Sequence, residues 1–312
     1  MHPGGKVRNQ NKVLYVTYVF FHMLISFSLC LFADTKLRLL HVRERVSTAN
    51  SLHSTLNRWG MSDHMFGNDP DVMILRSKSN KLKPDEKYTL CVLNNILGAL
   101  VFISDDVSEY TDEEHQLYAA TFPKVQAQVT SVVEFRDEVY IVEFRTTNNN
   151  GFNHRYTTYT NLSGDKQTIY LPEVSAGTNL LFATDNDIHT DHPDKKAPLF
   201  YLPSSPAQLK SHETKTFLHI PAATGASDPR LLGTTGHIVP GTEIAKLSSQ
   251  GNDINVCFVT DRVRKTKVMV GLGEFRRQPE GSFTLNGKPA VWETFDISGS
   301  ESAKVHAAII EE

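Results

Sequence analysis

Apolar residues recur at steps of three and four between residues 41 and 59. They are, in order, Val42, Val46, Ala49, Leu52, Leu56 and Trp59. This spacing places them on one face of a helix, so the pattern predicts an amphipathic α-helix over residues 41–59 that ends near Gly60. A continuous apolar run follows over residues 72–75, which is typical of a short strand buried on both faces.

A second helix is predicted over residues 84–97. The run Lys83-Pro84-Asp85-Glu86 combines a proline with acidic residues in a first turn, which is typical of a helix start, and Gly98 marks the end. Residues 99–103 form another apolar strand of the buried kind, and a last helix is predicted over residues 111–119. A strand, a helix and a strand with short connections indicate a parallel sheet.

This alternation is too short for a whole β/α barrel. A (β/α)8 barrel needs eight strand–helix units and about 250 residues. Only two or three such units fit before the pattern changes. The sequence therefore predicts that residues 34–120 form the C-terminal part of a (β/α)8 barrel, with its last strand–helix units.

After Pro123 the pattern changes to alternating apolar and polar positions. Apolar residues at 125, 127 and 129 and again at 139–144 flank the polar pair Asp137-Glu138, which predicts a hairpin. Further short β-rich runs, separated by Gly, Pro, Asn and Asp clusters, cover residues 169–171, 180–183, 217–220, 254–259, 267–270 and 283–285. Many short strands with turns between them indicate a C-terminal antiparallel β-sandwich over residues 121–312.

Residues 13–32 form a nearly continuous apolar run after three basic residues. This arrangement is typical of a secretory signal peptide cleaved near Ala33, and it then predicts an extracellular or secretory location. About 20 apolar residues can also span a bilayer, but His22, Ser26 and Ser28 interrupt the run and make a membrane anchor the less favoured interpretation. A third interpretation is an artefactual start, in which foreign sequence precedes the body of the protein. Residues 1–33 are therefore set apart from the folded domains.

The composition argues against several function classes. The formal net charge is −3 and the basic residues are scattered, so a nucleic-acid partner is not predicted. Cys30, Cys91 and Cys257 lie far apart, without zinc or disulfide spacing. The acidic loop over residues 184–202 lacks the order of an EF-hand, and His189 and His192 have proline-rich surroundings. No metal site is predicted.

The candidate chemistry lies beside the two apolar runs of the α/β region. Asn68-Asp69-Pro70-Asp71-Val72 leads into the first run, and Ser104-Asp105-Asp106 follows the second. A carboxylate beside a buried strand loses hydration, which is costly unless something pairs with it or uses it. These motifs, with the helix between them, resemble the last barrel units of α-galactosidase-type glycoside hydrolases, most closely the family thirty-six branch. The resemblance covers roughly residues 33–110, about a quarter of the chain.

The resemblance implies hydrolysis of terminal α-galactosides with retention, by two carboxyl groups and without a metal or organic cofactor. It places the catalytic acid/base at Asp34, although Cys30 stands where relatives have an arginine. The alternative for Asp34 is a polar residue just past the apolar run. The nucleophile is expected on an earlier strand, and residues 1–33 contain no aspartate.

The same resemblance implies three substrate-binding residues. Asp71 would bind sugar hydroxyls, and Val72 beside it would line the same pocket. Asp105 follows the second strand and falls at the face where barrel enzymes carry their active sites. The alternative for Asp105 and Asp106 is structural support of a helix start or a neighbouring turn.

The sequence thus predicts a glycoside hydrolase acting on terminal α-galactosides, present here in part, with a small-molecule or oligosaccharide substrate as its partner. The alternative from another class is an inactive carbohydrate-binding or structural remnant, and a third is a membrane-tethered β-domain protein. Oligomeric state is left open. Asn161-Leu162-Ser163 is a glycosylation sequon, which matters only if the chain enters the secretory pathway.

Overall fold

The computed structural model describes residues 48–62, 64–147, 153–173, 178–185, 199–222, 224–225, 228–259, 266–273, 281–298, 300 and 302–311. From Thr48 onward these residues belong to one compact unit. The apolar run over residues 13–32, Asp34, and the histidines at 189 and 192 lie outside the described residues. Within the described part, no helix combines the length and apolar character needed to cross a bilayer.

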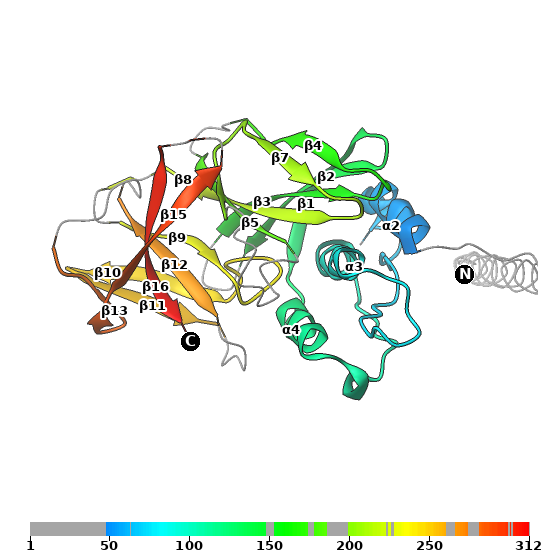
Figure 1. Ribbon diagram of the computed structural model, residues 1–312, viewed down its shortest axis with the longest axis horizontal. Helices are drawn as coiled ribbons and strands as arrows, with labels where there is room; N and C mark the ends of the chain where they lie inside the picture. The colour runs from blue at the N-terminus through cyan, green and yellow to red at the C-terminus, as the bar shows by residue number, and fades with distance from the viewer. Residues whose placement is uncertain are drawn as a thin grey trace, which may run out of the picture. The chain divides into compact units, whose positions relative to one another are not determined.

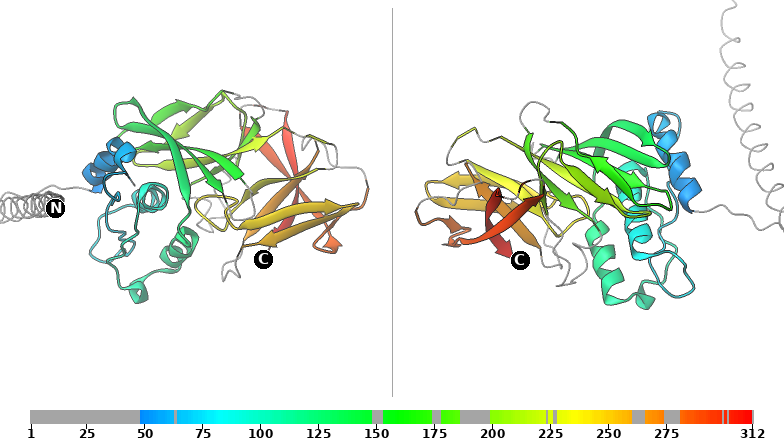
Figure 2. Two further views of the ribbon diagram at one scale, coloured as in Figure 1. Left: turned by 180° about the vertical axis from the view of Figure 1, so that it is seen from behind. Right: turned by 45° about the horizontal axis from the view of Figure 1, so that its top comes forward.

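The helices gather at one end of the strand-rich part (Figures 1 and 2). They are α2 (Thr48–Asn57), η1 (Trp59–Met61), α3 (Pro84–Leu97), η2 (Val107–Glu109) and α4 (Asp112–Thr121). The helices predicted over residues 84–97 and 111–119 are confirmed, and α2 confirms the described part of the helix predicted over 41–59. A capping box begins α4, where the Glu114 N–H donates to Thr111 Oγ1 and the Thr111 N–H donates to the Glu114 carboxylate.

Most strands belong to one sheet of ten strands in the order β1-β2-β3-β8-β5-β6-β15-β16-β12-β9, and β10-β11-β13-β14 and β4-β7 form two smaller sheets. The strands are β1 (Ala127–Arg136), β2 (Val139–Thr147), β3 (Asn153–Asn161), β4 (Gln167–Tyr170), β5 (Thr178–Thr184), β6 (Phe200–Tyr201), β7 (Pro206–Leu209), β8 (Thr214–Pro221), β9 (Pro229–Thr234), β10 (Ile244–Gln250), β11 (Asp253–Phe258), β12 (Lys267–Leu272), β13 (Thr284–Leu285), β14 (Lys288–Pro289), β15 (Val291–Ser298) and β16 (Lys304–Glu311).

The β-rich character predicted after residue 121 is confirmed. The predicted hairpin is β1–β2, and Glu138 takes a positive φ of 60° in its turn. The other predicted runs coincide with β4, β5, β8, β11, β12 and β13. The prediction of purely antiparallel pairing is wrong for two pairs, because β6 runs parallel to β15 and β11 runs parallel to β13. Parallel neighbours require a long crossover connection, which short-range sequence patterns do not reveal.

Strand β3 was not predicted, because its sequence is polar although its second half is buried. It pairs with β2 on one side and β8 on the other. Threonine hydroxyls satisfy one another across this pairing: Thr158 Oγ1 lies 3.0 Å from Thr216 Oγ1, and Thr214 Oγ1 donates to Thr160 Oγ1 at 3.1 Å. Buried hydroxyls are tolerated when they are hydrogen-bonded, so this strand shows no apolar alternation.

The two apolar runs on either side of α3 form one parallel bridge, between Met73 and Ile103. The parallel pairing is as predicted, but burial of the second run on both faces is wrong. Leu100 and Phe102 are 62% and 50% exposed, because in the part of the chain that the structure describes no second strand pairs with this segment. A partial (β/α)8 barrel therefore stays a prediction.

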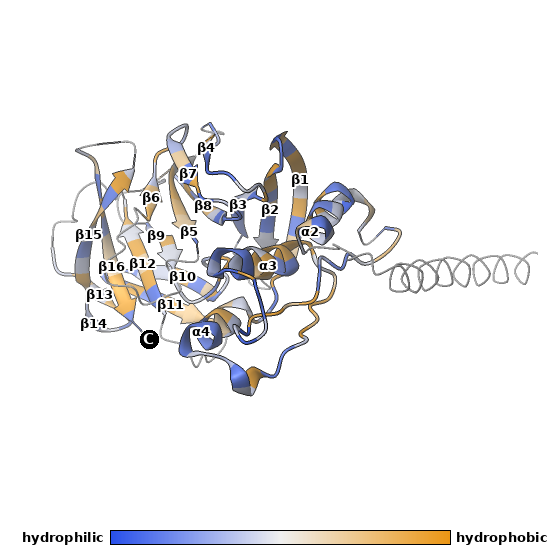
Figure 3. Ribbon diagram, turned by 45° about the vertical axis from the view of Figure 1, so that its right-hand side comes forward, coloured by the Kyte–Doolittle hydropathy of each residue, from blue (hydrophilic) through white to orange (hydrophobic). Residues whose placement is uncertain are grey.

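Helix α3 is shared between the α/β region and the large sheet. Every residue from Lys87 to Leu97 is buried, and Figure 3 shows apolar segments on α3 and on β1. Thr89 Oγ1 donates to the His212 carbonyl at 2.8 Å, on the turn that leads into β8. Asn95 Oδ1 accepts from the Val125 N–H at 2.9 Å, just before β1. One apolar core consequently runs from α2 through α3 to β15 and β16.

Candidate functional site

The parallel segments and α3 form a β-α-β unit. The Met73 N–H donates to the Phe102 carbonyl at 2.8 Å, and the Ser104 N–H donates to the Met73 carbonyl at 3.3 Å. Nearer the start of both segments, the Ala99 N–H donates to the Asn68 carbonyl at 2.8 Å. The two segments therefore run side by side in one direction, with their carboxyl ends at the same edge.

Asp71 and Val72 lie on the first of these segments, between the contacts made by Asn68 and Met73. Both residues are half-buried. The Asp71 carboxylate accepts the Val72 N–H at 2.7 Å through Oδ1, and no other described donor bonds to it. A carboxylate with this much exposure and this little bonding retains oxygen lone pairs for a hydroxyl donor.

Asp105 lies at the carboxyl edge, as the sequence predicts, but its carboxylate is hydrogen-bonded by other residues of the chain. Its oxygens accept the N–H groups of Leu75 and Arg76, the Arg76 guanidinium and the Tyr110 hydroxyl. The side chain is fully buried. Burial alone would raise the pKa of Asp105, but these donors outweigh it and lower the pKa below the ordinary value.

A cavity lies at the opposite edge of this unit. It has a volume of about 680 Å³, within the range typical of small-molecule sites. Asn68, Gly98 and Ala99, which line it, are at the amino ends of the two parallel segments. Asp71, Val72 and Asp105 are not among its lining residues.

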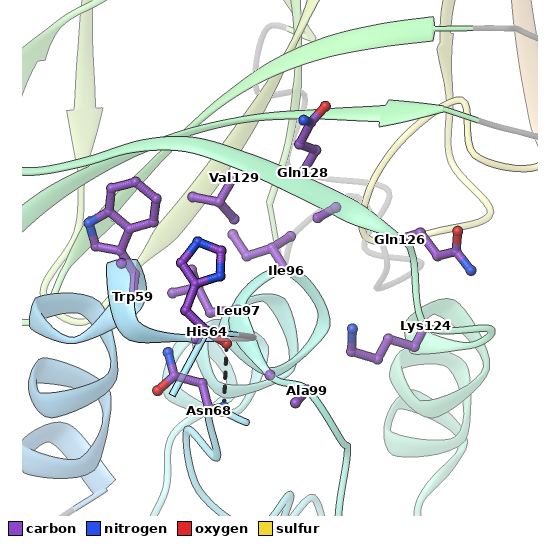
Figure 4. A pocket seen from close by; sticks show the side chains of 14 residues that line it. Trp59, His64, Asn68, Ile96, Leu97, Ala99, Lys124, Gln126, Gln128 and Val129 are labelled. Carbon is purple, nitrogen blue, oxygen red and sulfur yellow. Dashed lines mark hydrogen bonds between the residues drawn. The ribbon is translucent and has the colours of Figure 1, made fainter. Parts of the chain in front are cut away.

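Three elements far apart in sequence supply the cavity wall (Figure 4). Trp59 and His64 come from η1 and the turn after it, Ile96 and Leu97 from the end of α3, and Val129 from β1. In Figure 4, Trp59 and His64 lie on one side and Lys124 reaches in from the other. Sequence reasoning missed this site because no local motif joins these residues, and only the packing of α3 against β1 brings them together.

The described residues hold no group of His, Cys, Asp and Glu side chains that could bind a metal ion. The glycosylation sequon is also accounted for by local structure. Asn161 is fully buried, its amide nitrogen donates to the carbonyls of Asp165 and Lys210 at 2.7 and 2.8 Å, and its Oδ1 accepts the Ser163 hydroxyl at 2.7 Å. Asn161 therefore stabilises a turn, and its amide is engaged in the folded chain.

No protein-family model and no curated protein matches this sequence. Solved structures similar in part include α-galactosidase I of Mortierella vinacea (TM-score 0.42, 12% identity, 58% of this chain and 46% of that one). Others are a β-L-arabinopyranosidase of Geobacillus stearothermophilus (0.43, 10%, 57% and 42%) and the α-galactosidase of Saccharomyces cerevisiae with raffinose (0.39, 12%, 56% and 52%). The chain spans about half the length of each, or less.

Proposed function

We propose that this chain is a protein of the α-galactosidase type that recognises terminal α-galactosides, with Asp71 and Val72 in contact with the sugar. The observation that carries the proposal is the parallel pairing of Met73 with Ile103 across α3. It gives the Asn68-Asp69-Pro70-Asp71-Val72 motif the β-α-β setting that its sequence resemblance requires. An antiparallel or distant arrangement would have removed the basis for the resemblance.

Asp71 is the acid best suited to this role in the described part. Its carboxylate is half-buried and bonds only to the neighbouring amide of Val72. Charge-assisted hydrogen bonds from such a carboxylate to ring hydroxyls orient a sugar more strongly than neutral ones. Hydrolysis is the second half of the proposal, with Asp34 as the acid/base residue.

A second candidate function is recognition of the sugar without hydrolysis. The observation that favours it is the full engagement of Asp105 by Leu75, Arg76 and Tyr110. A retaining mechanism needs two working carboxyl groups about 5 Å apart. The carboxylate of Asp105, at the edge where barrel enzymes carry their active sites, is already bonded by the chain itself.

The test compares the whole chain with its Asp71→Ala, Asp69→Ala and Asp34→Asn variants. Methyl α-galactoside binding is measured by calorimetry and aryl α-galactoside hydrolysis by release of the phenol. Asp69 is the matched control, because it lies two residues from Asp71, is exposed, and interacts through its carbonyl with Thr55. We expect Asp71→Ala to abolish binding and Asp69→Ala to retain it.

The hydrolysis arm separates the two candidates. Turnover that disappears in Asp34→Asn supports the hydrolase, and binding without turnover in any variant supports recognition alone. If the unmodified chain binds no α-galactoside, or if Asp71→Ala binds as well as the unmodified chain, the proposed function is wrong.

A further inference from the structure

The β-α-β unit carries an apolar surface that no described element covers. More than half of the exposed large hydrophobic side chains in the described part of the chain lie in two short stretches, residues 61–66 and 100–103. Such side chains are normally scattered singly over a soluble protein, and a contiguous apolar patch is typical of an interaction site. The two stretches therefore indicate a binding surface.

One face of the second parallel segment is left uncovered. Val101 packs against the core that contains α3, whereas its neighbours Leu100 and Phe102 are largely exposed. Successive side chains of an extended segment point to opposite faces. Helix α3 therefore covers the face that bears Val101, and the other face presents Leu100 and Phe102.

Residues 65–66 continue this surface at the amino end of the segment. Gly67, directly after them, lies against Ala99, since a Cβ on Gly67 would come within 2.8 Å of the Ala99 Cβ. Both residues before Gly67, a methionine and a phenylalanine, are exposed. Residues 65–66 and 100–103 together form what we call the apolar edge.

The backbone of the apolar edge is open as well. The Phe102 carbonyl and the Ser104 N–H both bond to Met73 on the first segment. Backbone groups of successive residues in a strand point to opposite sides, so those of Val101 and Ile103 point away from the first segment. Among the described residues, no backbone hydrogen bond reaches these groups. An open strand edge of this kind is a template for pairing with another strand.

The apolar edge is complementary to a second copy of itself. When a two-fold axis passes between the Phe102 residues of two antiparallel copies, Val101 of one copy lies opposite Ile103 of the other. Directly opposed residues of this kind exchange both of their hydrogen bonds. The two pairs related by the axis then satisfy the open backbone groups of both copies, and the two Phe102 side chains lie next to each other on the exposed face.

Charge does not oppose this pairing. In the same register, Asp105 and Asp106 of one copy fall opposite Ala99 and Gly98 of the other, so no like charges face each other across the new strand pair. The Asp105 carboxylate is also compensated by Arg76 of its own chain. One patch thus meets the same patch on the second copy, which is the arrangement of an isologous two-fold interface.

We propose that the apolar edge binds a second copy of this chain and forms a two-fold dimer in which residues 101–103 of the two copies pair antiparallel. The pairing joins the two β-α-β units into one sheet and removes apolar side chains from water. A second copy is favoured over an unrelated extended peptide because the backbone groups, the side chains and the charges all match when the edge meets itself. This inference does not depend on the proposed galactoside function.

The first test measures the mass of the whole chain by sedimentation velocity at concentrations from about 1 to 100 μM, a range suited to a small interface. We expect a reversible equilibrium between monomer and dimer. Phe102→Lys and Leu100→Lys each place an ammonium group in the apolar contact, and each should raise the dissociation constant of the dimer roughly tenfold or more.

Tyr170→Lys is the matched control for these two variants. Tyr170 lies on β4, outside the apolar edge, and its side chain is as exposed as that of Leu100. This substitution should leave the dissociation constant unchanged. Asp71→Ala should also leave it unchanged, so the dimer and the binding of α-galactosides are tested separately.

Ile103→Pro tests the strand pairing itself. Proline removes the N–H that points to the open edge and leaves the bonds of Phe102 and Ser104 with Met73 in place. Ile103→Ala is the control, because both substitutions remove the isoleucine side chain and only proline removes the donor. We expect Ile103→Pro to raise the dissociation constant more than Ile103→Ala does. Circular dichroism checks that each variant is folded.

Three results would show that the inference is wrong. The first is a chain that stays monomeric up to about 100 μM, since the apolar edge would then bind something other than a second copy. The second is a dimer that folded Phe102→Lys and Leu100→Lys variants form as tightly as the unmodified chain. The third is an equal weakening of the dimer by Tyr170→Lys. Equal effects of Ile103→Pro and Ile103→Ala would contradict the antiparallel pairing.

Discussion

The Asp105 carboxylate links the carboxyl ends of the two parallel segments that pair through Met73 and Ile103. It accepts the backbone N–H groups of Leu75 and Arg76 from the first segment, and it bonds to the Tyr110 hydroxyl beyond η2. With the Arg76 guanidinium beside it, its charge is compensated although the side chain is buried. Asp105 therefore holds the two parallel segments together, as a longer ladder of backbone hydrogen bonds does in a full sheet.

Asp105→Ala should lower the free energy of unfolding by about 3 kcal/mol, because it removes one partner of a buried, hydrogen-bonded ion pair. Asp106→Ala is the matched control, since the Asp106 side chain is exposed and bonds only to Ser108. Urea denaturation followed by circular dichroism measures both. Equal, small effects of the two substitutions would show that the Asp105 contacts do not stabilise the fold.

The same contacts make stability depend on pH. Burial would raise the pKa of Asp105, but the donors around it lower the pKa below the ordinary value of about 3.9. A group with a lowered folded-state pKa stabilises the protein above its unfolded-state pKa and loses this contribution as the pH falls through the folded-state pKa. The unmodified chain should lose stability below about pH 4 more steeply than Asp105→Asn does.

At the scale of elements, strands β5 and β8 meet around a buried cluster of charges. Lys215 Nζ lies 3.3 Å from Asp185 Oδ2 and 3.8 Å from Glu213 Oε1, and all three residues are buried. Burial would lower the pKa of Lys215, but the two carboxylates outweigh it and raise the pKa. Burial raises the pKa of Glu213. Lys215 thus contributes positive charge to two buried acids at the ends of these strands.

Lys215→Met should lower the free energy of unfolding by roughly 3–5 kcal/mol near pH 7, because it removes the buried cation of this ion-pair cluster. The loss should shrink toward pH 4, since protonation of Glu213 removes part of the uncompensated charge. Lys210→Met is the control: its side chain is half exposed and 3.6 Å from Glu213, so the change should be under about 1 kcal/mol. A pH-independent loss in Lys215→Met would contradict this account.

The elements differ in how far the sequence predicts them. Helix α3 and the β1–β2 hairpin carry strong local signals, a proline with acids in the first turn and a polar turn between alternating runs. Strand β3 carries none, because its buried threonines are satisfied by Thr216 and Thr214 of β8. Asp71 and Asp105 were predicted from a motif, but the cavity at Trp59 and Lys124 depends on contacts between distant segments, and such contacts leave no local pattern.

At the scale of the whole molecule, α3 joins the helical and strand-rich parts into one core. It contacts β1 and β8 as well as α2 and α4. Lys87, near its start, pairs with Glu114 of α4 at 2.7 Å, and Asn95, near its end, bonds to the backbone at Thr121 and Val125. Unfolding either part alone would expose the buried surface of this helix.

We therefore expect the part of the chain from Thr48 onward to unfold in a single transition. The two tryptophans are placed to test this, since Trp59 belongs to η1 and Trp292 to β15. Urea denaturation of Trp292→Phe reports on the helical part, and that of Trp59→Phe reports on the strands.

Each fluorescence midpoint is compared with the midpoint that circular dichroism gives for the same variant. We expect the two midpoints to agree in both variants. Two separate midpoints within one variant would show that the helical and strand-rich parts unfold independently.

The shared helix also constrains how such a chain can change through gene rearrangement. A crossover between α4 and β1 would join a foreign sheet to helix α3. The hydrogen bonds of Thr89 with His212 and of Asn95 with Val125 would then be lost. Recombinants of this kind would retain the helices and strands of both parts but lose the contacts between the two parts. The two parts should therefore be inherited together.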